Sequence, residues 1–233
     1  MAVTTTPNDI LTAALGTSLK NRPGVLATDA TELRSKVIRA LRGLYAVAAR
    51  VNPTFFAESS AVAFLTSGWP RPETAESVYR IERNANTTGG SGASGSEVVV
   101  VPFDDRGAEL GQGAIYPFGQ VYRSAGNAMD PTGGELVLFY ARRPTDPATV
   151  NATLDAQWTE QFNELLILET ALYLAGKEST RGEEVARLTQ DRLVWLNLFI
   201  GFLQHETANV RHRYGHQTVV NVNSLLPLLA PGG

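Results

Sequence analysis

The chain has 233 residues, a formal net charge of −3 and no cysteine. Its 20 basic residues are 3 lysines and 17 arginines against 23 acids, which excludes the basic excess of a dedicated nucleic-acid binder. The lack of cysteine excludes a disulfide framework, a thiol nucleophile and a zinc–thiolate site. The first residues lack the apolar core of a secretion signal, so we expect a protein that stays in the cell where it is made.

The first third of the chain is predicted to be helical. A short amphipathic helix is expected over residues 8–20, and a longer one over residues 31–51, where apolar side chains recur at helical spacing. Asn52 and Pro53 are typical of a helix cap and a first helical position, so a third helix is expected over residues 52–65.

The middle of the chain changes to the alternation of β-strands. Strands are predicted at residues 77–84, 97–104, 120–124 and 135–143. Residues 86–96 consist of glycine and small polar side chains, which predicts a mobile loop. Residues 106–119 are interpreted as a second glycine-rich connection between strands.

Two long helices are predicted after this segment, over residues 151–176 and 182–213. The first has an apolar face at steps of three and four, which begins with Leu154 and Trp158. A short connection makes two such helices antiparallel neighbours. The second is apolar almost all the way round between residues 193 and 203, which favours either the core of a larger bundle or a subunit interface. For the interface we propose Trp195, Phe199 and Phe202.

The last residues are expected to form an extended tail, because Pro227 and Pro231 disfavour a helix. The segment QTVVNVNS alternates as a strand does and could be added to another protein's sheet. The alternative is that the tail folds back on the chain's own β-rich insert. The residues proposed to dock on a partner are Val219, Val220, Val222, Leu225 and Leu226.

These elements together predict a mainly α fold, a multi-helix bundle with a long antiparallel helix pair, a small β-rich insert and an extended C-terminal tail. The predicted parts are the N-terminal helices of the bundle at residues 1–68, the insert at 69–147, the helix pair at 148–213 and the docking tail at 214–233.

A search for catalytic motifs finds none that is complete. The glycine-rich loop lacks the Lys-Ser/Thr of a phosphate-binding loop. His205, His212 and His216 do not form the zinc-protease motif, and Glu160 and Glu164 lack the Glu-x-x-His partners of a di-metal bundle. We therefore expect no catalytic, cofactor-binding or metal-binding residue, and a protein that is not an enzyme. The apolar run from 193 to 203 is shorter than a membrane span, so no membrane partner is expected.

The order of the segments is informative in itself. GWPRPETAESVYRIERN, VVVVPFDD, IYPFGQVYRSAG and GGELVLFYARRP precede a helix pair with the LYLAGK pattern at residues 172–177 and a charged turn at 178–181. Over residues 31–213 this succession resembles the head-to-tail adaptor (connector or neck) proteins of tailed bacteriophages.

The resemblance implies a structural virion protein that forms a ring of about twelve copies beneath the portal. Such a ring extends the DNA channel, lets genomic DNA pass without sequence-specific contact and offers a surface to the tail or tail-completion protein. The implied location is the neck of the virion, assembled in the host cytoplasm. The alternatives are a tail-tube or tail-completion protein, or an enzyme or small-ligand-binding helical protein that uses the glycine-rich loop as a lid.

Overall fold

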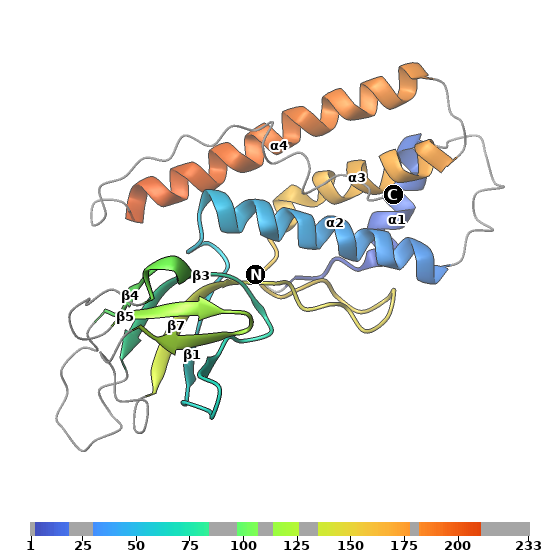
Figure 1. The fold of residues 1–233 in the computed structure, drawn as a ribbon. Coiled ribbons are helices and arrows are strands. Elements are labelled where there is room, and N and C mark those ends of the chain that lie inside the picture. The colour runs from blue at the N-terminus through green and yellow to red at the C-terminus, as the bar shows by residue number, and fades with distance from the viewer. Residues whose placement is uncertain are drawn as a thin grey trace. The chain divides into compact units, whose positions relative to one another are not determined.

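The computed structural model describes residues 3–18, 30–83, 97–106, 114–125, 135–177 and 182–210. The chain divides into two compact units (Figure 1). Unit 1 combines Met1–Phe55 with Arg143–Gly233, and unit 2 is the intervening segment Phe56–Arg142. The chain thus leaves unit 1 after its second helix and returns to it after the last strand of unit 2.

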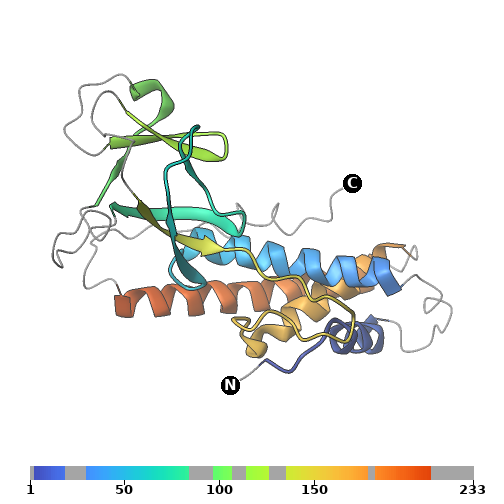
Figure 2. The same ribbon diagram turned by 90° about the horizontal axis from the view of Figure 1, so that it is seen from below.

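The described part of unit 1 contains four α-helices. They are α1 (Pro7–Ser18), α2 (Ala30–Val51), α3 (Asn163–Lys177) and α4 (Gly182–Val210), with a short 3-10 helix, η4 (Glu160–Phe162), before α3. Helix α3 contacts each of the other three. Figures 1 and 2 show that α3 and α4 are antiparallel, as their short connection predicts.

The apolar periodicity of the helices explains this packing. Helix α2 buries one face and exposes the arginines Arg39, Arg42 and Arg50 on the other. Helix α3 is buried on more than one side because it lies among three neighbours. Among the fully or nearly fully buried side chains of these two helices are Val37, Leu41, Leu44, Ala48, Leu165, Leu166, Leu168, Ala171 and Leu174.

The first long helix is shorter than predicted, because residues 151–159 are not helical. The Asp155 carboxylate accepts hydrogen bonds from the backbone N–H groups of Gln157 (2.9 Å) and Thr145 (2.6 Å). An Asp that binds nearby backbone donors stabilises a turn at the expense of a helix. Leu154 and Trp158 are nevertheless buried in unit 1, but from this irregular segment.

The described residues of unit 2 form two small sheets. The first has the order β1-β7-β3, with β1 at Ala57–Val62, β7 at Leu136–Arg142 and β3 at Ala75–Arg83, and all its pairs are antiparallel. The second has the order β2-β6-β5-β4; its strands are β2 (Trp69–Pro70), β6 (Val121–Ser124), β5 (Ala114–Phe118) and β4 (Val99–Val100). Only β4 and β5 are parallel among these described pairs. A 3-10 helix, η3 (Phe103–Asp105), follows β4.

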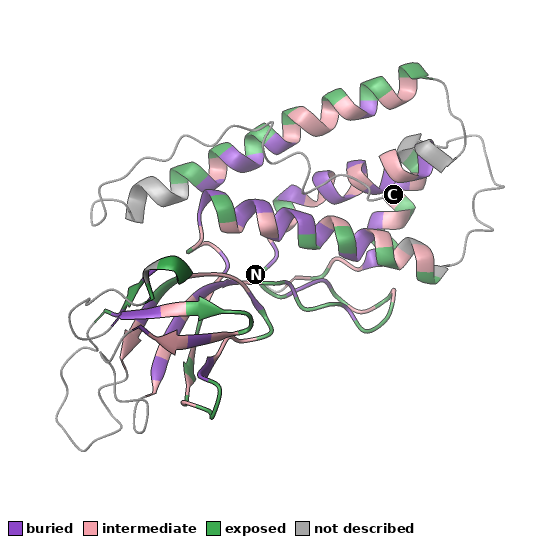
Figure 3. Ribbon diagram, viewed as in Figure 1, coloured by how far each residue is buried: buried purple, intermediate pink, exposed green. Residues whose placement is uncertain are grey.

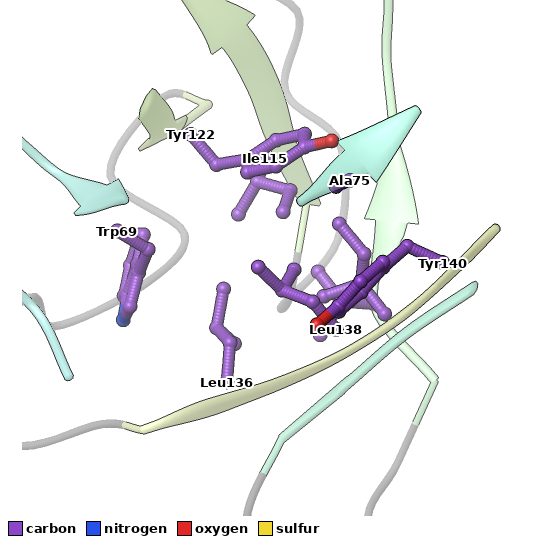
Figure 4. Packing of buried hydrophobic residues seen from close by; sticks show 9 residues of the cluster. Trp69, Ala75, Ile115, Tyr122, Leu136, Leu138 and Tyr140 are labelled. Atoms are coloured by element: carbon purple, nitrogen blue, oxygen red, sulfur yellow. The ribbon is translucent and has the colours of Figure 1, made fainter. Parts of the chain in front are cut away.

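Both sheets contribute to one hydrophobic core (Figure 4). Leu136 and Leu138 of β7 lie opposite Ile115 of β5 and Tyr122 of β6, with Trp69 beside them. Trp69 and Ile115 are fully buried, so the two sheets close on a dry interior.

The predicted fold class is wrong. The chain is a mixture of α and β structure with two sheets, not a mainly α multi-helix bundle. The helix predicted over residues 52–65 is also absent, and strand β1 takes its place. Residues from Ala57 to Val62 pair in continuous register with β7, and such tertiary pairing overrides local helix propensity. The β unit consequently begins at Phe56 rather than at residue 69.

Candidate interaction surfaces

The aromatic residues proposed for a subunit interface face the interior of unit 1. Phe199 is fully buried, with its ring centroid 4.8 Å from that of Phe162. Phe202 is half-buried and lies 5.6 Å from Phe55 and 5.2 Å from Phe162, again between ring centroids. Trp195 is half-buried and packs against the cluster that contains Leu188. Phe199 is therefore a core residue of its own chain, which corrects its assignment to an interface. For the half-buried Phe202 and Trp195 that assignment stays a prediction.

The opposite side of α4 carries a different apolar stripe. Val194 and Leu198 are 54% and 55% exposed, and Gly201 is exposed one turn further on. The steps of four and three place all three on one face of the helix, which we call the α4 stripe. Buried and exposed positions alternate along α4 in Figure 3.

No neighbour in the described part of the chain is close enough to Gly201 to require a glycine at this position. A Cβ atom there would meet nothing within 4 Å, although glycine in a helix interior costs about 1 kcal/mol relative to alanine. The missing side chain leaves the backbone of α4 accessible beside Leu198. This accessible backbone is the kind of place where another element can approach a helix closely.

Polar side chains surround the α4 stripe. Gln190, Asn197 and Gln204 are exposed, and Arg187 pairs with Asp191 one turn before Val194 at 3.4 Å. An exposed pair four residues apart on a helix stabilises it by only about 0.3–0.5 kcal/mol, so both side chains can be rearranged by a partner. An apolar centre with a polar rim is the usual composition of a protein interface.

An ion pair lies on the inward side of the same helix. The Arg192 guanidinium contacts the Glu169 carboxylate of α3, and both side chains are largely buried. Burial raises the pKa of Glu169, while the charge of Arg192 and its hydrogen bond oppose that rise. This pair joins α3 to α4 and is turned away from the α4 stripe.

Unit 2 carries a second exposed apolar surface, which sequence reasoning missed. Phe103 of η3 and Phe118 of β5 are 42% and 44% exposed, and their rings stack with centroids 5.9 Å apart. The guanidinium carbon of Arg106 lies 4.1 Å from the Phe103 centroid, and that of Arg123 lies 4.1 Å from the Phe118 centroid. With Tyr116, 5.8 Å from Phe103, these residues form what we call the aromatic–arginine surface.

Strand β5 positions this surface. Tyr116 and Phe118 are two residues apart, so they share one face of the strand, and Ile115 points from the other face into the core of unit 2. Arg123 pairs in register with Tyr116 from the adjacent strand β6. Beyond β5 lies the edge strand β4, whose Val99 and Val100 side chains are exposed and, as successive strand residues, point to opposite faces of the sheet.

The sequence did contain a signal for β5. AIYPF is apolar throughout and rich in strand-forming side chains, but Pro117 and the glycines before it led us to interpret residues 106–119 as a connection. Pro117 is exposed and sits on the strand without disrupting its pairing to β6.

Of the two carboxylates considered for a metal site, Glu160 and Glu164, Glu160 has a structural role. Glu160 accepts hydrogen bonds from the backbone N–H and hydroxyl groups of Thr4 and Thr5, with donor–acceptor distances from 2.7 to 3.2 Å. The backbone and hydroxyl donors of Thr5, followed by those of Thr4, lower the pKa of Glu160 to about 2. Glu160 thus anchors the N-terminal segment to the start of η4.

Within the described residues, no group of three or more His, Cys, Asp or Glu side chains could hold a metal ion. No helix in the described ranges is long and apolar enough to cross a membrane. His212, His216, the loop at residues 86–96 and the proposed docking residues Val219, Val220, Val222, Leu225 and Leu226 lie outside the described residues.

No protein-family model matches the chain, and no curated protein matches it in sequence.

Proposed function

We propose that this protein is a structural subunit of the neck of a tailed bacteriophage, a head-to-tail adaptor whose copies form a ring beneath the portal. The ring would continue the DNA channel and offer a surface to the tail or tail-completion protein, without a catalytic role. The order of segments along the chain suggests the family, and the α4 stripe carries the proposal.

The α4 stripe supports self-association for a physical reason. Helix α4 is packed on α2 and α3, and among the described residues Val194 and Leu198 on its far side stay more than half exposed. Two exposed aliphatic side chains beside an unexplained helical glycine are suited to a contact with a protein partner. In a ring, each copy contacts two neighbours, so such a surface would be covered in every subunit.

The charge of the chain is compatible with a DNA channel. A formal net charge of −3 repels the phosphate backbone weakly overall, which favours passage over retention. The apolar tail residues Val219, Val220, Val222, Leu225 and Leu226 are proposed to anchor the ring by docking on the portal.

The test is assembly with a portal. The purified protein is mixed with portal rings from candidate phages, and the mixture is examined by mass measurement and negative-stain electron microscopy. We expect a second ring with a central hole stacked on the portal. A chain that forms no ring, alone or with any portal offered, overturns the proposal. Truncation after Tyr214 tests the anchor, because the shortened chain should fold but no longer bind the portal.

A further inference from the structure

We propose that the aromatic–arginine surface of one copy receives the α4 stripe of the next copy, so that a head-to-tail contact between unit 2 and α4 joins the subunits. This inference rests on the proposed ring and names the two halves of its contact. The occupant of the aromatic–arginine surface is therefore a second copy of this chain.

The distribution of exposed apolar side chains leads to this pairing. The described residues expose eight large hydrophobic side chains, and four of them belong to these two surfaces. Of the eight, two are the stacked rings of Phe103 and Phe118, two lie on the edge strand β4 (Val99 and Val100), and two form the α4 stripe (Val194 and Leu198). The two surfaces are different patches of the chain, as a contact that continues from copy to copy requires, and they belong to different units.

The side chains of the two surfaces are chemically suited to pack on each other. The stripe is a narrow aliphatic ridge with an open backbone at Gly201, whereas Phe103 and Phe118 present stacked rings against which aliphatic side chains pack well. Asp191 is the carboxylate next to the stripe, one turn before Val194. Arg106 and Arg123 flank the rings and could pair with such a carboxylate at the rim of the contact.

The hydrogen bonds that orient Arg106 and Arg123 use only part of the N–H donors of each guanidinium. Arg106 donates to the Phe103 carbonyl oxygen at 3.0 Å, and Arg123 donates to the Ser67 carbonyl oxygen at 3.1 Å. A guanidinium has five N–H donors in a fixed fork, so each retains donors for a partner. These bonds and the stacked rings preorganise the surface, which lowers the entropy lost on binding.

A nucleic acid is a poorer occupant of the same surface, although aromatic rings with arginines can also bind bases. Between residues 56 and 142 there are ten acidic residues against six arginines and no lysine, a net charge of −4. This charge disfavours a phosphate backbone, which carries one negative charge per nucleotide, whereas the carboxylate of Asp191 beside the α4 stripe is balanced by its pairing with Arg187.

The contact predicts complementation between two defective variants. The helix variant is Val194→Ser with Leu198→Ser, and the sheet variant is Phe103→Ser with Phe118→Ser. Each variant retains only one of the two surfaces, and a contact between identical copies needs both. Each variant alone should therefore remain monomeric by sedimentation velocity under conditions where the wild-type chain assembles. Their equimolar mixture should form a heterodimer and nothing larger, because each variant supplies the surface that the other lacks.

The matched control, Leu65→Ser with Tyr79→Ser, removes two of the other large hydrophobic side chains that the described residues expose and should assemble as the wild type does.

Each outcome is informative. Wild-type assembly together with a mixture that stays monomeric overturns this pairing but leaves the proposed ring intact. A wild-type chain that does not assemble even on portal rings overturns both. Circular dichroism of each variant confirms that it is folded, and single Leu198→Ser and Phe118→Ser variants replace any double variant that is not. Each single variant should then weaken assembly at least about tenfold.

Thiol cross-linking provides a second measurement, because the chain has no cysteine of its own. A chain with both Leu198→Cys and Phe118→Cys should give a ladder of disulfide-linked oligomers under a mild thiol oxidant. The same oxidant should leave either single variant monomeric. Efficient dimers of Leu198→Cys alone would overturn the proposal, because α4 would then pair with α4. Addition of a single-stranded oligonucleotide should not block the ladder, and a block would identify a nucleic acid as the occupant.

Discussion

The hydroxyl of Tyr45 in α2 donates a hydrogen bond of 3.0 Å to the carboxylate of Asp155, 110 residues later in the chain. Both side chains are buried, and the same carboxylate accepts the backbone N–H groups of Thr145 and Gln157. One side chain thus fastens the irregular segment before α3 to helix α2. A buried carboxylate with several donors stabilises a structure that no local sequence pattern specifies.

Asp155→Ala is expected to destabilise unit 1 by about 2 kcal/mol or more, because it removes the acceptor of the buried Tyr45 hydroxyl and of two part-buried backbone N–H groups. Tyr45→Phe removes one donor and should cost about 1–2 kcal/mol. Chemical denaturation monitored by circular dichroism measures both. The control is Asp146→Ala, which removes a carboxylate that pairs with Arg42 in a more exposed position and should cost less than about 1 kcal/mol. Equal losses for Asp155→Ala and Asp146→Ala would contradict the role of Asp155.

The lowered pKa of Glu160 predicts how the stability of the fold depends on pH. Its pKa in the folded chain is about 2, below the ordinary value of 4.5, because Thr5 and Thr4 donate hydrogen bonds to the ionised carboxylate. A lowered pKa means that this contribution to stability is complete above pH 4.5 and is lost as the pH falls towards about 2. Glu160→Gln should remove it, so the stability curves of the wild type and the variant should converge over that range. Glu164→Gln removes the same charge near the start of α3 and serves as the control; convergence of the same size there would refute the assignment to Glu160.

A comparison of Gly68 with Gly119 distinguishes the cost of backbone strain from the cost of a close contact. Both have positive φ, 131° and 62°, but a Cβ at Gly68 would lie 2.3 Å from the Tyr122 carbonyl oxygen, whereas one at Gly119 meets nothing within 4 Å. Gly68→Ala should therefore destabilise unit 2 by about 3 kcal/mol or more. Gly119→Ala should cost only about 1–2 kcal/mol, the strain of a left-handed backbone. Thermal unfolding compares the two, and a smaller loss at Gly68 would argue against the close approach of Tyr122.

Substitution by Asp should have different effects at Phe202 and at Leu198, on monomer stability at the first and on assembly at the second. Phe202→Asp is expected to destabilise the monomer by about 3 kcal/mol or more, because Phe202 packs on Phe55 and Phe162. Leu198→Asp, on the exposed side of the same helix, should change monomer stability by about 0.5 kcal/mol or less and impair assembly instead. Denaturation of dilute protein and sedimentation of concentrated protein measure the two effects. If Phe202→Asp spares the monomer and abolishes assembly, Phe202 belongs to the interface that the sequence alone suggested.

The sequence determined those elements whose stabilising pattern is local. The periodicity of α2 and the alternation in β3, β6 and β7 lie within single segments, and the short connection makes α3 and α4 antiparallel. Strand β1 and the segment at residues 151–159 were predicted to be helical because their local patterns allow a helix. Pairing with β7 and the hydrogen bonds of Asp155 come from residues distant in the sequence, and these decided otherwise.

The interaction surfaces show the same division. The sequence of α4 between residues 193 and 203 is apolar nearly all round, so the composition alone cannot say which side is covered. Only the packing of α4 on α2 and α3 fixes its rotation about its own axis, which places Phe199 inside and Leu198 outside. Likewise, Phe103 and Phe118 are separated in the chain, and only the pairing of β5 with β4 and β6 brings them together with their two arginines. A surface is a property of neighbours in space, and those neighbours are set by tertiary contacts that the periodicity of one segment does not contain.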